Sequence, residues 1–66
     1  MKTTYSLNMY GVGPFPRFTE GYKTLAQAQT LARQALADGF HTVNILSDKP
    51  VKSGYIVREV IQTLEA

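Results

Sequence analysis

Residues 3–10 alternate between apolar and polar side chains. The apolar positions recur at every second residue, at Tyr5, Leu7 and Met9. This period is typical of a strand with one face buried and the other exposed. Tyr10 interrupts the polar side at the end of the stretch, where a tyrosine either packs at a sheet edge or forms part of a binding surface. We therefore predict a half-buried strand over residues 3–10.

Residues 11–23 contain three of the five glycines and two of the three prolines of the chain. Proline removes a backbone donor and fixes φ, whereas glycine permits the left-handed conformations of tight turns. We therefore predict that the whole segment is a loop. Loops of this length are uncommon in small domains, and those that occur are often functional.

A helix is predicted from Thr24 to Gly39. The sequence Thr24-Leu25-Ala26-Gln27 matches a capping box, in which the Thr24 hydroxyl accepts from a backbone amide and the Gln27 side chain reaches back. Apolar side chains then recur at helical spacing, at Leu25, Ala28, Leu31, Ala32, Ala35 and Leu36. Gly39 is expected to end the helix as its C-terminal cap residue. The alanines predict a close approach to one face of a sheet, with only the leucines reaching deep into it.

A second strand is predicted over residues 40–47, where Val43 and Ile45 alternate with polar residues. Asp48-Lys49-Pro50 is expected to end this strand in a turn. Lys49 and Lys52 then form a basic tip, as a solvated hairpin connection should.

The last segment fits two different periods. As a helix, it would place Val57, Val60, Ile61 and Leu64 on one face. As a strand over residues 54–62, it would be apolar on both faces. We favour the strand, because tyrosine, isoleucine and valine dominate its first half and a hairpin is the simplest connection to the preceding strand. A short terminal helix is the alternative.

These elements predict a single α+β domain over residues 1–66. Its order is β-α-β-β, a three-stranded antiparallel-type sheet with one helix packed on one face. The other face would be uncovered, although the last strand would direct apolar side chains to both sides. A domain of this size buries too little surface to be more than marginally stable. We therefore predict a homodimer that covers the exposed apolar side chains.

Composition narrows the chemistry that the chain can perform. It has no cysteine and a single histidine, His41, which excludes disulfide bonds and thiolate zinc sites. Nucleophilic and paired-carboxylate catalysis both need groups for which this sequence offers few candidates, so we predict no enzyme activity, no metal and no cofactor. We expect a soluble cytoplasmic protein that does not enter membranes, because no signal-peptide core and no apolar run of roughly 20 residues is present.

Aromatic and basic side chains are interleaved in the predicted loop. Aromatic residues and arginine are enriched among the anchors of protein interfaces. We predict that a protein partner is bound by the loop residues together with the basic hairpin tip, and the set is Phe15, Arg17, Phe18, Tyr22, Lys49 and Lys52. Phe18 and Tyr22 also fit an alternative in which they fold back over the small core.

The charge distribution leaves a second function open. The formal net charge of +2 is a mild excess, and the lysines and arginines are scattered along the chain. If folding gathers them, they would contact phosphates and the loop aromatics would stack on bases. The alternative prediction is therefore nucleic-acid binding by Arg17, Lys23, Lys49, Lys52 and Arg58.

The short first strand, the helix from Thr24 to Gly39 and the following hairpin resemble the β-α-β-β layout of small phage and mobile-element proteins, including some anti-CRISPR inhibitors. The resemblance covers most of the chain but concerns the layout alone, so it assigns no functional residue. It implies an inhibitor or accessory protein that occludes a surface of a larger host complex.

Overall fold

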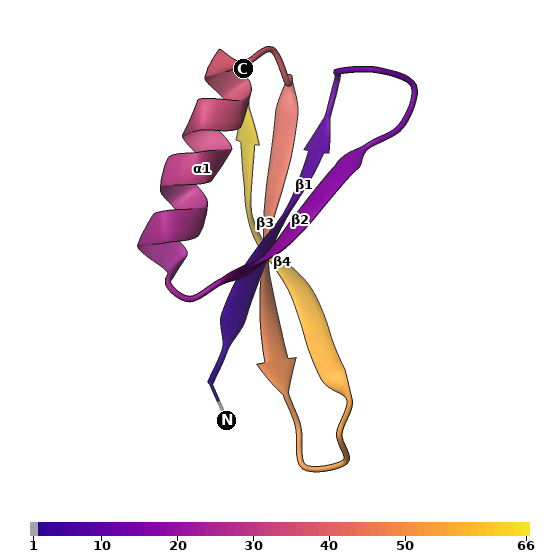
Figure 1. Ribbon diagram of the computed structural model, residues 1–66, viewed down its shortest axis with the longest axis vertical. Helices are drawn as coiled ribbons and strands as arrows, with labels where there is room; N and C mark the ends of the chain where they lie inside the picture. The colour runs from indigo at the N-terminus through magenta and orange to yellow at the C-terminus, as the bar shows by residue number, and fades with distance from the viewer. Residues whose placement is uncertain (1) are drawn as a thin grey trace.

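A computed structural model, described here over residues 2–66, contains four strands and one helix (Figure 1). Their order is β1 (Thr4–Tyr10), β2 (Arg17–Tyr22), α1 (Leu25–Ala37), β3 (Thr42–Pro50) and β4 (Ile56–Glu65). The strands form one antiparallel sheet in the order β2-β1-β3-β4, with α1 on one face. The α+β class and the single helix are confirmed, whereas the prediction of three strands is wrong because there are four. Within residues 2–66, no helix has the length and apolarity needed to cross a membrane.

The additional strand is β2, which lies inside the segment predicted to be a loop. The two prolines of that segment, Pro14 and Pro16, both precede Arg17, so they interrupt only the connection between β1 and β2. Gly21 lies within β2 with φ +92° and is skipped by the pairing, because Tyr5 pairs with Tyr22 while Ser6 pairs with Glu20. An extra residue of this kind is a β-bulge, which a strand tolerates. Within residues 11–23, only residues 11–16 and Lys23 therefore lie outside a strand.

Both ends of α1 follow the predicted capping pattern. The Thr24 hydroxyl accepts a hydrogen bond from the Gln27 backbone amide at 3.1 Å, and the Gln27 side chain accepts from the Lys23 amide at 3.3 Å. At the other end, Gly39 follows the cap residue Asp38 and has φ +113°. The Phe40 amide donates to the Ala35 carbonyl at 3.2 Å, which together with the glycine makes a Schellman motif.

The core lies between α1 and the two central strands. The helix contributes three buried alanines, Ala28, Ala32 and Ala35, against buried side chains of β1 and β3, among them Leu7, Val43 and Ile45. The close approach of the helix to the sheet is therefore confirmed, but the prediction that its leucines reach deep into the core is wrong. Leu25 and Leu36 are half-buried and Leu31 is exposed, because a helix that approaches on its alanines leaves the longer side chains on its flanks.

The last segment is strand β4 and not a helix, which confirms the favoured interpretation. β3 is longer than predicted, since Asp48 pairs with both Thr4 and Arg58 and the ladder continues to Pro50. The turn lies in residues 51–55, where the Val51 amide donates to the Tyr55 carbonyl at 3.0 Å. Pro50 fits in β3 because β1 pairs only as far as Asp48, so one side of β3 is open there.

The face of the sheet opposite α1 is mainly polar, and its exposed apolar side chains include Ile56 and Val60, which β4 directs to this face as predicted. The pairing register places on this face polar or charged residues of all four strands, including Asn8, Glu20, Asn44, Asp48, Arg58 and Thr63. Leu46 is also on this face but is buried. The exposed large apolar side chains of the sheet are concentrated on β4.

Two glycines at the start of the β1–β2 loop allow a matched test of this backbone. A Cβ on Gly11, where φ is +116°, would lie 2.8 Å from the His41 backbone nitrogen, whereas a Cβ on Gly13, where φ is +78°, would meet nothing within 4 Å. We expect Gly13→Ala to lower the free energy of unfolding by about 1 kcal/mol through backbone strain alone. Gly11→Ala should lower it by about 2–4 kcal/mol, because strain and a backbone clash act together. Urea unfolding followed by circular dichroism measures both, and equal losses would contradict the close packing of Gly11 on His41.

Candidate functional site

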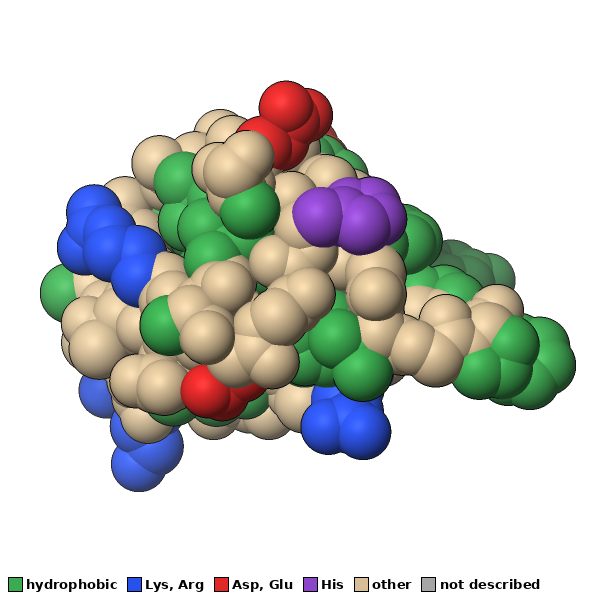
Figure 2. All heavy atoms as spheres, turned by 90° about the horizontal axis from the view of Figure 1, so that it is seen from above, with side chains coloured by type: hydrophobic (Ala, Val, Ile, Leu, Met, Phe, Trp, Pro, Cys, Tyr) green, Lys and Arg blue, Asp and Glu red, His purple; other side chains and the backbone are tan. Residues whose placement is uncertain are grey.

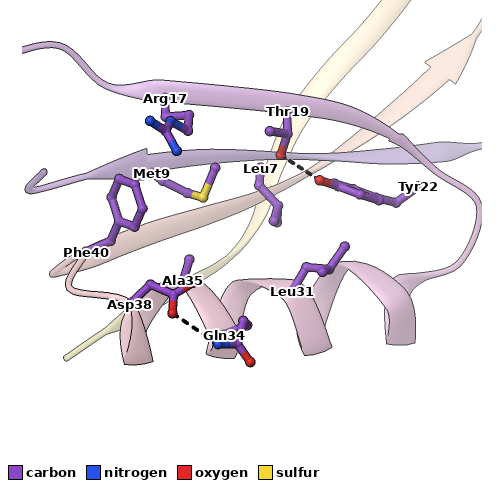
Figure 3. Close-up of a pocket in the computed structure, with 10 residues that line it drawn as sticks. All are labelled: Leu7, Met9, Arg17, Thr19, Tyr22, Leu31, Gln34, Ala35, Asp38 and Phe40. Atoms are coloured by element: carbon purple, nitrogen blue, oxygen red, sulfur yellow. Dashed lines mark hydrogen bonds between the residues drawn. The ribbon is translucent and has the colours of Figure 1, made fainter.

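A groove runs between β2 and α1 on the helix side of the sheet (Figure 3). It exists because α1 packs chiefly on β1 and β3 and leaves the inner side of β2 uncovered. Its volume is about 220 Å³, and it is open to solvent along its length. The floor is apolar and consists of Leu7, Met9, Leu31, Ala35 and Phe40. The rim is polar, with Arg17, Thr19 and Tyr22 on the β2 side and Gln34 and Asp38 on the α1 side.

Arg17 stands at one end of the groove, where β2 begins. It pairs with Met9, which places its side chain on the helix side of the sheet. Its guanidinium carbon lies 5.9 Å from the centre of the Phe40 ring, a distance at which a cation and a ring attract each other. Among the described residues, every ion pair within 4.0 Å belongs to Arg58. Arg17 is therefore an exposed cation at the rim without a carboxylate partner in residues 2–66.

Tyr22 stands at the other end of β2 and shares the groove with Arg17. Its hydroxyl donates a hydrogen bond to the Thr19 hydroxyl at 2.7 Å. Residues three apart on a regular strand point to opposite faces. Because the bulge at Gly21 adds one residue, Thr19 and Tyr22 both face α1. The bulge is thus what directs the tyrosine into the groove.

The opposite bank of the groove carries a negative charge. Asp38 caps the end of α1, and its carboxylate accepts a hydrogen bond from the Gln34 side chain at 3.1 Å. Asp38 is more than 4.0 Å from the Arg17 nitrogens, since no ion pair joins them. The groove therefore presents a cation on one bank and a carboxylate on the other, above an apolar floor.

The structure brings together two of the six predicted site residues, Arg17 and Tyr22. Phe15 is 80% exposed in the loop before β2. In Figure 2, hydrophobic side chains project on the side where that loop lies. Lys49 and Lys52 lie around the β3–β4 turn, at the opposite end of the molecule from this loop (Figure 1). Phe18 points to the other face of the sheet, because it pairs with Asn8. The six residues therefore do not form one surface.

Sequence reasoning missed the α1 side of the groove and its floor. Gln34 and Asp38 lie outside the apolar stripe that the helical spacing predicts, and Phe40 belongs only to the predicted strand over residues 40–47. No local signal identifies them, because their proximity to Arg17 depends on β2 being a strand beside β1. The one available signal was the confinement of both prolines to positions before Arg17.

Arg58 forms a separate cluster on the opposite face. Its Nε donates to the Asp48 carboxylate at 2.6 Å, and one of its terminal nitrogens lies 3.5 Å from the Glu20 carboxylate. Its guanidinium carbon is 4.8 Å from the centre of the Phe18 ring. The hydrogen bond to Asp48 and the nearby negative charges raise the pKa of Arg58 above its ordinary value. Arg58 is therefore committed to contacts within the chain.

The basic side chains do not gather on one face. Lys2 and Lys23 line one cavity beside the start of α1, while Lys49 and Lys52 lie at the far hairpin and Arg58 is paired. Figure 2 shows lysine and arginine side chains as separate groups around the outline of the view. A phosphate backbone is bound by clustered cations. The lysines and arginines therefore do not form the clustered cationic surface that nucleic-acid binding favours.

Potential metal-binding side chains in residues 2–66 do not cluster either. Among the described residues, no group of three or more histidine, cysteine, aspartate or glutamate side chains could hold a metal ion. His41 is exposed, and its Nδ1 lies 2.8 Å from the Thr42 hydroxyl. Comparisons with protein families, with curated proteins and with solved structures gave no match. The groove and the exposed edges of the sheet are therefore the candidate functional features of this chain.

The Arg58 cluster can be tested by removing each of its carboxylates in turn. Asp48 is almost fully buried and makes the shorter contact, whereas the Glu20 contact is longer and exposed. Asp48→Ala should lower the urea midpoint of unfolding clearly, because it leaves a gap and takes away the main partner of Arg58. Glu20→Gln should change it little, since exposed ion pairs contribute little. Equal effects of the two substitutions would contradict the assignment of Asp48 as the principal partner.

Proposed function

We propose that this chain is a non-enzymatic protein-binding module that takes an extended segment of its partner along β2 and into the groove beside α1. The observation that supports this is the position of the groove, which lies directly beside an edge strand. β2 pairs only with β1, so its outer edge carries backbone groups that no other strand satisfies. An added strand would form hydrogen bonds with these groups.

The groove supplies the side-chain recognition that strand addition by itself lacks. In an added strand, alternate side chains point to the same face of the sheet. Those that face α1 would meet the floor formed by Leu7, Met9 and Phe40. An opening of about 220 Å³ suits one bulky apolar side chain rather than a whole small molecule, because small-molecule pockets are typically about 300–1,000 Å³.

The charges at the rim favour a particular segment. Arg17 offers a planar cation without a carboxylate partner in the described chain, and arginine binds carboxylates through paired hydrogen bonds. Asp38 on the other bank repels an acidic group placed beside α1. The preferred segment therefore carries an apolar side chain over the floor and an acidic side chain beside Arg17. A module that pairs with such a segment also covers it, which suits an inhibitor or accessory protein.

The test uses two labelled octapeptides, a glutamate peptide with the sequence Val-Thr-Glu-Thr repeated twice and a lysine peptide with the sequence Val-Thr-Lys-Thr repeated twice, so that valine and the charged residue share one face of an added strand. Fluorescence anisotropy should show tighter binding of the glutamate peptide. Arg17→Ala should weaken that binding at least tenfold, which corresponds to about 1.4 kcal/mol and is within the range of charge-assisted hydrogen bonds. Leu31→Glu should weaken it too, because it places a charge over the floor. Lys49→Ala is the matched control, since it removes a cation at the far hairpin, and it should leave binding unchanged.

A glutamate peptide methylated on alternate backbone nitrogens separates strand addition from binding by side chains alone. Methylation removes the donors that pair with β2, so affinity should fall although the side chains are unchanged. Equal affinity for the glutamate and lysine peptides, or an Arg17→Ala protein that binds as tightly as Lys49→Ala, would overturn the proposal.

A further inference from the structure

We infer that β4 is the surface through which two copies of this chain associate, edge to edge and antiparallel, so that the two sheets continue into one. The groove takes no part in this association, because it lies at the opposite edge of the sheet. The sequence predicted a homodimer through the uncovered face of the sheet, whereas the contact inferred here is the edge of one strand, β4.

The first observation is the exposure of apolar side chains along β4. Ile56 is 61% exposed, Val57 41%, Val60 53% and Ile61 44%, and Tyr55 just before the strand is 74% exposed. Ile56 and Val60 pair with Pro50 and Leu46 of β3, whereas Val57 pairs with Lys49 between them, so both faces of the strand carry apolar groups. Exposed apolar side chains concentrated along one strand are typical of an interaction site.

The second observation is that residues 56–60 of this edge carry little of the usual protection against pairing. Proteins shield edge strands by keeping them short, or by placing lysine, proline or a bulge on them. β4 is ten residues long, contains neither lysine nor proline, and has its bulge at Ile61, beyond residues 56–60. Its single arginine, Arg58, is turned toward Asp48 and Glu20 of its own chain. Backbone donors and acceptors are therefore accessible beside apolar side chains.

The third observation is the arm formed by the β3–β4 hairpin. β1 pairs with β3 only as far as Asp48, so the hairpin beyond that residue has two strands and extends past the rest of the sheet and past α1 (Figure 1). A two-stranded ribbon alone is marginally stable in water. Pairing with another strand along β4 would give this arm a third strand and remove its apolar side chains from water.

A second copy fits this surface better than stacking on the uncovered face does. Two antiparallel strands related by a two-fold axis present the same backbone groups to each other, so one edge suffices for both partners. Stacking would instead bury polar side chains such as Asn8, Asn44 and Thr63, which costs free energy unless each finds a partner. The pairing skips Ile61, because Ile45 pairs with Gln62 and Leu46 with Val60. This bulge confines regular pairing between the copies to residues 56–60.

Sedimentation equilibrium of the full chain tests the association. We expect a species of twice the 7.3 kDa chain mass at micromolar concentration, and an apparent stability that rises with protein concentration. Val60→Lys and Ile56→Lys should each raise the dissociation constant at least tenfold, because a charge would be buried at the contact. Val12→Lys is the matched control, since Val12 is also exposed (44%) but lies in the β1–β2 loop, and it should leave the dimer intact.

Single-cysteine variants locate the contact, because the chain has no cysteine of its own. Under oxidation, a mixture of the Ile56→Cys and Val60→Cys proteins should give a disulfide-linked dimer, because antiparallel pairing over residues 56–60 places these two positions opposite each other, whereas Phe15→Cys mixed with either should not. Sedimentation as a monomer up to millimolar concentration, or cross-linking on β4 no greater than that of Phe15→Cys, would overturn the inference. The Val60→Lys protein should still bind the glutamate peptide, because the groove lies at the opposite edge of the sheet. A loss of the dimer can therefore be distinguished from a loss of peptide binding.

Discussion

A single thirteen-residue helix that packs on a four-stranded sheet through alanine is the constraint on which the remaining features depend. Strands lie about 4.8 Å apart and a helix with its side chains is about 10 Å wide, so one helix covers roughly two strands. Ala28, Ala32 and Ala35 hold α1 over β1 and β3. Both edge strands therefore extend beyond the helix, and each leaves a different surface exposed.

The two edges differ in the chemistry that they expose. Beside β2, the uncovered strip becomes a groove, because α1 forms a second wall and β1 supplies the floor. Its charged rim suits recognition of a particular sequence, since one bank is positive and the other negative. Along β4 there is no second wall, and the exposed side chains are aliphatic with an adjoining tyrosine. Such a surface favours association without demanding particular charges, and this is the property that a self-pairing edge needs.

Two bulges shape these surfaces. Gly21 adds one residue to β2 and thereby turns Tyr22 to the same face as Thr19. Ile61 adds one residue to β4, so that Val60 and Thr63 both lie on the face opposite α1. The same two strands are joined by Arg58, which reaches from β4 to Glu20 and Phe18 of β2. A flat sheet would keep these residues three strands apart, so the contact requires the strong twist seen in Figure 1.

Local patterns in the sequence determined the elements whose stability is local. The ends of α1 depend on Thr24, Gln27 and Gly39, and the inward faces of β1 and β3 follow from strict alternation. Tertiary structure alone decided the rest. β2 is a strand because β1 pairs with it, the groove exists because α1 stops short of it, and Arg58 is paired because the sheet twists. These features depend on contacts between distant segments, and a hydrophobic pattern along the chain does not specify such contacts.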